Sequence, residues 1–428
     1  MKFDLPRGMR DLVSQEYDNI NYVRERFLDS ISLFNFKFME PSPIEMLSTL
    51  ETKGGPSISN EIYSFSDKAG RSIALRFDLT IGLTRFVTAR RDLKMPAKLA
   101  TFAGVWRYDE PQAERYRYFH QWDVEIYDSF SYESDAEIIE FVSVFFKRLG
   151  LDVTIEVNDR QLMEQFVRQR LGVTDEDIIL EMFRAVDKVS KKGANQILIE
   201  YKDKIQYPLL QRLINVSNKR GTIDEIVRSD RDLVEFVEAS NLVKLMDSLK
   251  ARRVNNVRIN LGIVRGLDYY SGIVFETFDP LAISGALVGG GRYDNLTKAF
   301  GRKDIGATGA AGGVERIVAA LGRKGILKSN QPPMVYVAFD PNHMSKYGLE
   351  IVSILRNSGI SADYDLHGRT LGRQLDDASA KGASITIIVS PDEIEKGQVT
   401  LRSMKDGVER KEHIKDITKN LNTTLLPL

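Results

Sequence analysis

Cysteine is absent from this sequence of 428 residues, which excludes disulfide bonds and thiolate metal sites. Histidine is scarce as well, because only four occur, at His120, His343, His367 and His413. None of them stands at a metal-ligand spacing from another, so a metalloenzyme built on imidazole ligands is not expected. The sequence leaves the identity of any metal ligand unknown.

Long apolar runs are also missing. Residues 1–8 lack the apolar core of a secretory signal, and no stretch approaches the ~20 apolar residues that a membrane-spanning helix needs. We therefore expect a cytoplasmic protein without membrane contact. Charge of one sign is not in excess either, since 60 Lys and Arg balance 60 Asp and Glu. Any nucleic-acid partner must then be bound by a local patch of positive charge.

The N-terminal part of the chain has the pattern of a sheet with helices. Residues 15–34 place apolar side chains at helical spacing, which predicts an amphipathic helix. Strand-like alternation follows in four runs, 36–43, 61–65, 72–77 and 117–127. We predict an antiparallel sheet with helices on one side.

The middle of the chain changes character. Residues 160–250 combine helical periodicity with many charges and few glycines. We interpret the segment from about 165 to 248 as a helical insertion in the sheet domain. Strand patterns return at 257–262 and 273–278, and a helix is expected to begin near Gly313. The domain so defined spans residues 1–327.

Residues 328–333 have the composition of a linker. Beyond them, strand-like runs at 334–339 and 384–389 alternate with helical stretches at 343–358 and 369–381. This alternation predicts a separate α/β domain over 332–428, with a mainly parallel sheet.

The densest group of chemically active side chains lies between Trp106 and Glu125. Strand-like flanks enclose a proline-containing turn, which predicts a hairpin with Arg107 on its first strand and with Arg115 and Arg117 at its tip. A guanidinium on a rigid strand can hold a phosphate through two parallel hydrogen bonds. A charged ribbon whose arginines pair with nearby carboxylates explains the same residues, and composition alone favours that plainer alternative.

Two further groups are less specific. Residues 264–276 place an arginine, a glycine, an acid and adjacent tyrosines before a strand, which suits an oriented polar ligand but also ordinary packing. The glycine-rich stretches 285–294 and 306–316 would let backbone approach a planar base or a phosphate. Tight packing of a helix on a sheet needs small residues equally well. Neither stretch is a Walker loop or a Rossmann fingerprint.

Taken in order, these groups resemble the motifs of class II aminoacyl-tRNA synthetases. The first group is similar to motif 2, residues 312–316 are similar to motif 3, and the stretch that ends at Pro43 is similar to motif 1, the dimer-forming element. Residues 265–270 resemble a block found only in the histidine-specific members. The resemblance extends from Pro6 into the C-terminal domain, which is similar to the anticodon-binding domain of several class II enzymes.

The resemblance implies a fold and a function. The fold class is α+β, with a class II synthetase-type antiparallel-sheet catalytic domain, a helical insertion and a C-terminal α/β anticodon-binding domain. The function is that of a histidine–tRNA ligase. L-Histidine would be activated with ATP and Mg²⁺ to histidyl-adenylate, with release of pyrophosphate, and then transferred to the 3′ end of tRNA(His). A homodimer is expected from motif 1.

The resemblance also implies roles in binding ATP and tRNA. Arg107 would bind the α-phosphate of ATP, Arg316 the γ-phosphate, and Arg265 would lie between the α-phosphate and the histidine carboxylate. Asp109 would join the ATP site. Arginines and magnesium would then neutralise the reacting anions, and no general base would be needed. The acceptor end of tRNA would be contacted by Gln112, Arg115 and Arg117.

The histidine pocket follows from the same resemblance. The ammonium group would sit among Asp78, Thr80 and Gln121. The imidazole would be held by Glu125 and Tyr270, beside Tyr269, and Tyr293 would close the pocket. A site that hydrogen-bonds a substrate group discriminates against analogues lacking that group by a factor of roughly 10⁴ to 10⁵. No editing domain is therefore required.

Some positions depart from the family pattern. Asp78 is one methylene shorter than the usual glutamate, and Asp109 replaces the glutamate of motif 2. Glu110 and Glu114 would repel a phosphodiester, which leaves the acceptor-stem contacts open. Two other functions are compatible with part of this pattern. One is a regulatory subunit of ATP phosphoribosyltransferase, although such subunits generally lack the anticodon-binding domain. The other is an RNA-binding module, which would leave the co-occurrence of Arg107, Arg265 and Arg316 unexplained.

Overall fold

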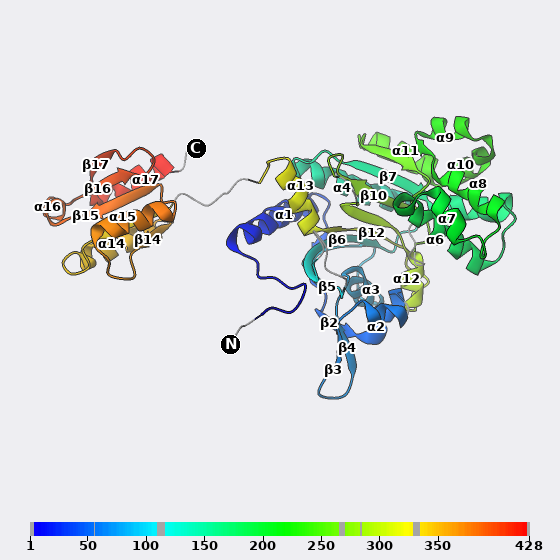
Figure 1. Cartoon of the computed structure of the whole chain (residues 1–428), viewed down its shortest axis with the longest axis horizontal. Coiled ribbons are helices and arrows are strands. Elements are labelled where there is room, and N and C mark those ends of the chain that lie inside the picture. The colour runs from blue at the N-terminus through cyan, green and yellow to red at the C-terminus, as the bar shows by residue number, and fades with distance from the viewer. Residues whose placement is uncertain are drawn as a thin grey trace. The chain divides into compact units, whose positions relative to one another are not determined.

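The computed structural model describes residues 4–54, 56–108, 116–264, 270–282, 285–327 and 334–425. Its internal contacts divide the chain into two compact units, Met1–Lys328 and Ser329–Leu428 (Figure 1). Each unit is built on its own sheets with helices packed against them, which confirms the predicted α+β class. No helix among the described residues is both long enough and apolar enough to cross a membrane.

A nine-stranded sheet organises the described part of the first unit, in the order β1-β5-β6-β12-β11-β10-β7-β9-β8. Its strands are β1 (Lys37–Phe38), β5 (Ala97–Trp106), β6 (Tyr118–Tyr127), β7 (Thr154–Asp159), β8 (Arg220–Gly221), β9 (Val257–Asn260), β10 (Ile273–Phe278), β11 (Val288–Arg292) and β12 (Ala307–Gly313). Neighbours are antiparallel except for β1 with β5 and β7 with β9. The central strands thus form the predicted antiparallel sheet.

One face of this sheet is covered by α1 (Ser14–Leu33), α4 (Tyr132–Leu149) and α13 (Val314–Arg323). The predicted helix at 15–34 and the helix expected near Gly313 are both confirmed. Alternate residues of β6, among them Trp122, point into this core, where the Phe27 ring of α1 lies 5.6 Å from the Trp122 ring. Since side chains alternate along a strand, the residues between them point to the opposite face.

The opposite face is covered only in part, by α3 (Thr80–Ala89) and α12 (Asp294–Ala299). Beside them lie α2 (Leu47–Gly54) and a three-stranded sheet of β2 (Ile44–Met46), β4 (Ser72–Leu75) and β3 (Ser64–Ser66). The runs 61–65 and 72–77 were expected in the large sheet, and that placement is wrong. They pair with each other and with β2, because alternation predicts a strand but not its neighbours.

The middle segment folds into short helices between β7 and β9. They are α5 (Arg160–Gln165), α6 (Glu176–Lys192), α7 (Ala194–Glu200), α8 (Tyr207–Ser217), α9 (Ile223–Ser229), α10 (Val234–Ala239) and α11 (Leu242–Ala251), and Figure 1 draws them in green at the β7 end of the sheet. The segment also contains the short strand β8, which pairs with β9 and returns the chain to the sheet. We call residues 160–251 the insertion.

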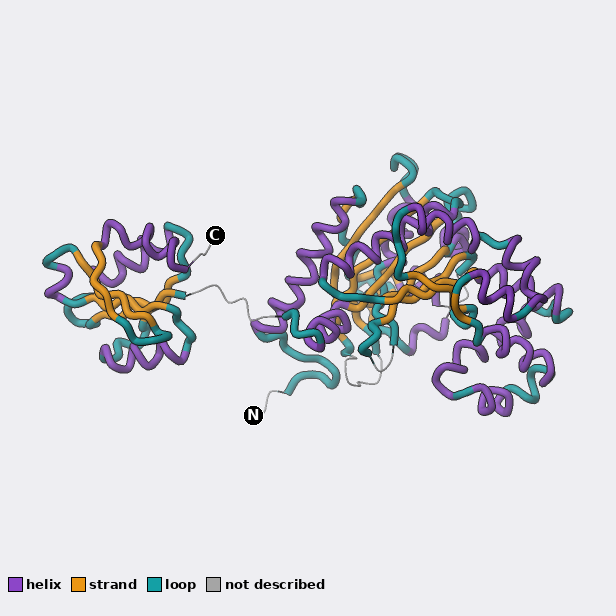
Figure 2. Tube along the Cα trace, turned by 90° about the horizontal axis from the view of Figure 1, so that it is seen from above, coloured by secondary structure: helices purple, strands orange, loops and turns teal. Residues whose placement is uncertain are grey.

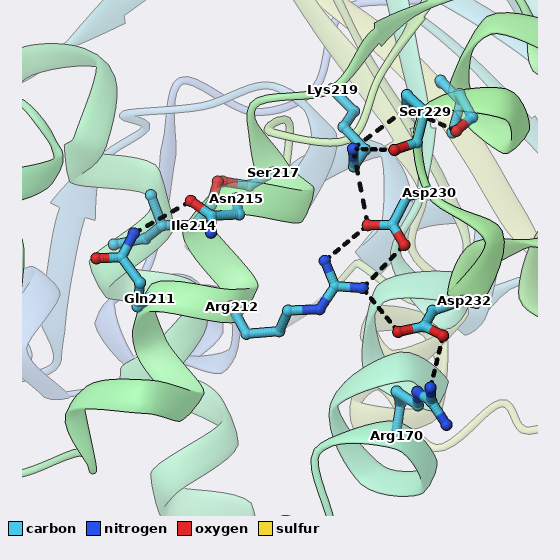
Figure 3. Close-up of polar contacts among 11 residues, drawn as sticks. Arg170, Gln211, Arg212, Ile214, Asn215, Ser217, Lys219, Ser229, Asp230 and Asp232 are labelled. Atoms are coloured by element: carbon cyan, nitrogen blue, oxygen red, sulfur yellow. Dashed lines mark hydrogen bonds and ion pairs between the residues drawn. The ribbon is translucent and has the colours of Figure 1, made fainter.

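Ion pairs hold the insertion helices together (Figure 3). Arg212 of α8 donates two hydrogen bonds to Asp230, at 2.6 and 2.9 Å, and a third to Asp232 at 3.1 Å. Arg170 donates to the same Asp232 at 2.5 Å, and Lys219 lies 3.7 Å from Asp230. Because Lys219 directly precedes β8, this network fixes the point where the insertion joins the large sheet.

The second unit has a five-stranded sheet in the order β14-β13-β15-β16-β17. Its strands are β13 (Val335–Phe339), β14 (Ala362–Tyr364), β15 (Ile385–Val389), β16 (Gln398–Ser403) and β17 (Glu409–His413). Its helices are α14 (Ser345–Asn357), α15 (Leu371–Ala380), α16 (Pro391–Ile394) and α17 (Ile417–Leu425), and helices lie on both faces of the sheet (Figure 2). The sheet is mixed and not mainly parallel as predicted, because β16 and β17 continue it by antiparallel hairpins.

Candidate active site

A cavity of about 1250 Å³ lies on the face of the large sheet that faces away from α1 and α4. Strands β6, β10, β11 and β12 form its floor, and the beginnings of α3 and α13 contribute to its rim. Eight of the residues singled out from the sequence line this one cavity: Asp78, Thr80, Arg107, Gln121, Glu125, Tyr270, Tyr293 and Arg316. They come from segments far apart in the chain, and the fold brings them together.

Strand β6 supplies the polar floor of the cavity. Gln121, Asp123 and Glu125 alternate along it, and each is almost fully buried. Their partners on β12 are Gly313, Ala311 and Gly309, in the same order. These partners leave room that larger side chains would fill, since a Cβ at Gly309 would lie 1.4 Å from Glu125 Oε2. The glycine-rich sequence is therefore needed for space over the carboxylates.

At one end of the cavity, hydrogen bonds connect α3 to β6. Thr80 Oγ1 donates to Asp123 Oδ2 at 3.0 Å, and Gln121 Nε2 donates to Asp123 Oδ1 at 2.8 Å. Asp78 Oδ1 accepts from the backbone N–H of Ile81 at 3.2 Å, which satisfies a donor at the first turn of α3. The three predicted ammonium-binding residues thus line the same cavity, and two of them, Thr80 and Gln121, share the carboxylate of Asp123, which was not predicted from the sequence.

Further along β6, Glu125 is 1% exposed and accepts a hydrogen bond from the Tyr293 hydroxyl. Burial raises the pKa of Tyr293 well above its usual range, and the charge of Glu125 adds to this effect. The phenol therefore stays protonated and remains a donor. Tyr270, also buried, lines the same part of the cavity. A carboxylate between phenols can bind an N–H-bearing ring.

Two arginines from different elements line the cavity. Arg107 follows β5, and its guanidinium donates to Phe77 O at 3.0 Å and to Gln121 Oε1 at 3.3 Å. Arg316, in the first turn of α13, donates to Ala286 O at 2.8 Å. These backbone carbonyl contacts orient each guanidinium at the cavity lining, where an arginine can bind an anion.

Two known protein families match the chain, one over each of its two units. A family model described as histidyl-tRNA synthetase matches residues 8–317, and a second, described as anticodon binding domain, matches residues 333–424.

The chain belongs to the histidyl-tRNA synthetase family.

Its relatives in the family span nearly its whole length. A protein named histidine–tRNA ligase from Pyrococcus furiosus is 34% identical over 428 residues, with 98% of each chain covered. One of the same name from Thermococcus kodakarensis is 34% identical over 420 residues, with 96% of each chain covered. Because the match includes both units, the family assignment does not rest on one domain.

Solved structures agree at the level of the fold. The crystal structure of histidyl-tRNA synthetase from Nostoc sp. PCC 7120 superposes with a TM-score of 0.82 at 23% identity and covers 99% of this chain and 100% of that chain. A structure described as an ATP phosphoribosyltransferase regulatory subunit/histidyl-tRNA synthetase, from Bacillus halodurans, gives a TM-score of 0.75 at 22% identity, covering 91% and 99%. The regulatory subunit and the synthetase share this fold, so the fold alone does not separate them.

One residue expected from the family pattern lies elsewhere. Arg117 was predicted at the tip of the hairpin, and that placement is wrong. It is only 8% exposed, and its backbone carbonyl accepts from Arg107 N at 2.9 Å, which puts it in the last strand pair before the hairpin loop and not in the loop itself. Its guanidinium packs 4.1 Å from the centre of the Tyr108 ring and donates to Arg7 O. Arg117 is therefore largely buried and held by these contacts.

Several other predicted residues lie outside the described part of the chain. They are Asp109, Gln112, Arg115, Arg265 and Tyr269, together with Glu110 and Glu114. Within the described ranges, no cluster of three or more His, Asp or Glu side chains is arranged to hold a metal ion. The sequence and the described structure therefore assign no metal ligand.

Besides Asp123, two features of the synthetase cavity were not predicted from the sequence. Its far end is lined by Asp187 and Ser190 of the insertion helix α6, which carry no motif that could have identified them. Near α13, the Glu315 carboxylate accepts two bonds at 3.0 Å from the backbone N–H of His120 and lies 3.1 Å from the His120 ring. This contact fixes the start of β6 against α13, and it gives His120 a structural partner in place of a metal.

Proposed function

We propose that this chain is a histidine–tRNA ligase that activates L-histidine with ATP and then transfers it to tRNA(His). The observation that carries the proposal is that Arg107, Arg316 and the Glu125–Tyr293 pair line one cavity. Phosphate-binding and ring-binding groups thereby meet across a space large enough for a nucleotide and an amino acid. The family relationship supports the same assignment.

In the activation step, a carboxylate oxygen of histidine attacks the α-phosphorus of ATP. The bond between the α-phosphorus and the bridging oxygen breaks, and pyrophosphate leaves with that oxygen and its electron pair. The attacking carboxylate is already ionised at neutral pH, so no residue has to remove a proton. Catalysis then consists of positioning and of neutralising charge.

We assign these tasks to arginines. Arg107 binds the α-phosphate, Arg316 binds the γ-phosphate, and Arg265 contacts the α-phosphate and the histidine carboxylate. Asp109 is placed beside ATP. Mg²⁺ enters as part of the MgATP substrate, whose phosphates supply most of its ligands. The carbonyl contacts of Arg107 and Arg316 support this assignment, because they hold each guanidinium at the cavity before ATP binds.

Selection of histidine is assigned to two groups of side chains, one that includes Gln121 of β6 and one that includes Glu125 of β6. The ammonium group is bound among Asp78, Thr80 and Gln121. The imidazole is bound by Glu125 and Tyr270, with Tyr269 beside it and Tyr293 closing the pocket. The burial of these described side chains supports the assignment, since hydrogen bonds discriminate best where water is excluded.

The transfer step requires tRNA at the same cavity. Gln112 and Arg115 are proposed to contact the acceptor end, while the burial of Arg117 argues against a direct contact by that residue. The domain over 332–428 is proposed to read the anticodon, and the domain over 1–327 to carry the chemistry, with its helical insertion at about 165–248. The family models match the same two regions.

A cytoplasmic homodimer is proposed for the assembled enzyme. Apolar side chains that are 41–43% exposed gather on β1 and β2, at Phe38, Ile44 and Met46. β1 is also an edge strand of the large sheet. An edge strand with exposed apolar neighbours favours pairing with a second copy. The cytoplasmic location is inferred from the family's role in protein synthesis.

ATP–pyrophosphate exchange across a panel of amino acids tests the function. We expect exchange that is stimulated by histidine alone. Exchange with no amino acid dependence, or with another amino acid, contradicts the proposal. RNA binding without exchange would identify an RNA-binding module, and stimulation of ATP phosphoribosyltransferase without exchange would identify a regulatory subunit.

A further inference from the structure

Asp123 is a fully buried carboxylate at the centre of β6. Its two oxygens accept different donors: Oδ2 accepts from Thr80 Oγ1 at 3.0 Å, and Oδ1 accepts from Gln121 Nε2 at 2.8 Å. A buried carboxylate is costly unless hydrogen bonds compensate for the lost water. Asp123 obtains this compensation from side chains that line the cavity.

These bonds determine what the cavity presents to a ligand. A threonine hydroxyl has one hydrogen, so Thr80 uses its only donor on Asp123 and keeps its lone pairs for another partner. Gln121 turns its NH₂ toward Asp123, and its carbonyl oxygen consequently lies 3.3 Å from Arg107. Both side chains are thereby fixed as acceptors on the ligand side. A substrate ammonium group has three donors and no acceptor, and it matches this arrangement.

We propose that Asp123 is a positioning residue for the ammonium group of the amino acid substrate. It acts through Thr80 and Gln121, whose oxygens it keeps turned toward the substrate, and its negative charge adds attraction for the cation. The inference rests on the proposed function and adds a residue to it.

An asparagine at position 123 reverses one of the two contacts. One carboxylate oxygen becomes an NH₂ donor, which cannot accept from Thr80 or Gln121. Either the Thr80 hydroxyl rotates and points its hydrogen at the ammonium, or the Gln121 amide flips and points its NH₂ at the ammonium and at Arg107. In both cases an acceptor on the ligand side becomes a donor.

The test compares wild type and Asp123→Asn by ATP–pyrophosphate exchange. We expect the KM for histidine to rise about tenfold or more, because hydrogen bonds to charged groups are among the stronger ones. The KM for ATP should stay within about twofold, since no phosphate contact is changed. Two inhibitors separate the role from a general loss of structure. The Ki of L-histidinol, which keeps the ammonium, should rise with the KM for histidine, whereas the Ki of imidazolepropanoate, which lacks it, should not change.

Thr101→Val serves as the matched control. Thr101 lies directly opposite Asp123 on β5 and is equally buried, and its hydroxyl has no hydrogen-bond partner among the described residues. Its loss should leave both inhibitor constants unchanged. If Asp123→Asn does not fold, as judged by thermal melting, Asp123→Ser removes the buried charge and should raise the KM for histidine in the same direction.

The outcomes separate the two claims. A wild-type chain without histidine-dependent exchange overturns the proposed function and this inference with it. An active wild type whose Asp123 variants keep the wild-type KM for histidine overturns the inference alone. Equal weakening of histidinol and imidazolepropanoate also overturns it, because that result indicates general damage to the pocket.

Discussion

The Tyr293 hydroxyl donates a hydrogen bond to Glu125, and both side chains are buried in the cavity. Glu125 therefore reaches its ligand with one oxygen already engaged and its orientation fixed. Tyr293→Phe removes only the donor, and we expect the KM for histidine to rise about tenfold. Glu125→Gln should have a larger effect, of about a hundredfold, because it removes the charge that binds an imidazole N–H.

The matched control for this pair lies in the second unit. The Tyr336 hydroxyl donates to Asp377 Oδ2 at 3.0 Å, which is the same chemistry away from the cavity. Tyr336→Phe should leave the KM for histidine at the wild-type value in the exchange assay. A similar increase in both phenylalanine variants would argue against a specific role for Tyr293.

Gly309 is expected to be intolerant of a side chain. A Cβ at this position would lie 1.4 Å from Glu125 Oε2 and 2.7 Å from Val124 O, so Gly309→Ala must displace the carboxylate. We expect histidine-dependent exchange to fall about a hundredfold or more, as follows when a binding group is misplaced by about 1 Å. Gly322→Ala, in α13, meets no atom within 4 Å and should leave exchange unchanged. Normal exchange in Gly309→Ala would show that the carboxylate position is not critical.

Arg316 is expected to act on ATP. Arg316→Ala should lower kcat/KM for ATP about a hundredfold or more, because a charge held against the triphosphate is lost. Arg323→Ala is the control on the same helix, since Arg323 is paired with Asp279 at 3.0 Å and lies outside the cavity lining. Initial rates of exchange at varied ATP concentration measure both variants. Equal effects of the two substitutions would indicate damage to α13 and not loss of a phosphate contact.

Asp135 should give the fold a pH dependence. Burial raises the pKa of Asp135 to about 6, against the lowering effect of Arg292, whose guanidinium lies 3.0 Å away. A carboxyl with a raised pKa in the folded state binds its proton more tightly there than in the unfolded chain. Its contribution to stability is thus present at low pH and is lost as the pH rises through about 6.

The expected difference can be measured with Asp135→Asn, which cannot titrate. Between about pH 5 and about pH 7, wild type should lose about 1 kcal/mol of unfolding free energy relative to the variant. Urea unfolding of both proteins at the two pH values gives this number. Parallel changes in wild type and variant would mean that Asp135 is ionised throughout.

The ion-pair network of the insertion should matter for its stability. Arg212→Ala leaves the partly buried carboxylates of Asp230 and Asp232 without their shared partner, and we expect a loss of about 1–3 kcal/mol. Arg90→Ala breaks an exposed pair with Asp92, which water and salt screen, and should leave the melting temperature almost unchanged. Thermal melting compares the two. Equal melting temperatures for both variants would show that the network adds nothing beyond a surface pair.

Helices and strands were predicted most accurately where their hydrophobic pattern extends over many residues. The helix at α1 and the central strands β6 and β10 follow from periodicity, because their buried faces repeat over many residues. The two-residue strand β8 has no period that could be recognised, and the neighbours of β3 and β4 depend on pairing over a distance. The resemblance to synthetase motifs indicated which residues belong to the site, but it did not indicate that Arg117 is buried.

The site shows the same limit. Gln121 and Glu125 were expected from a motif, whereas Asp123 between them was passed over, because its importance comes from Thr80, which is distant in sequence. The glycines of β12 were noted as a weak signal. Their role follows only from the register of β12 and β6, which pairs Gly309 with Glu125.

The Gly309–Ala311–Gly313 face of β12 has a consequence for how this pocket can change. Where a side chain forms the wall of a binding site, a substitution can trim it and admit a bulkier molecule. Here the wall is largely peptide backbone, and two of its three positions have nothing left to trim. More room on this side would require the strand itself to move, so a point mutation could enlarge the pocket only elsewhere in its lining, for example at Tyr270 or Tyr293.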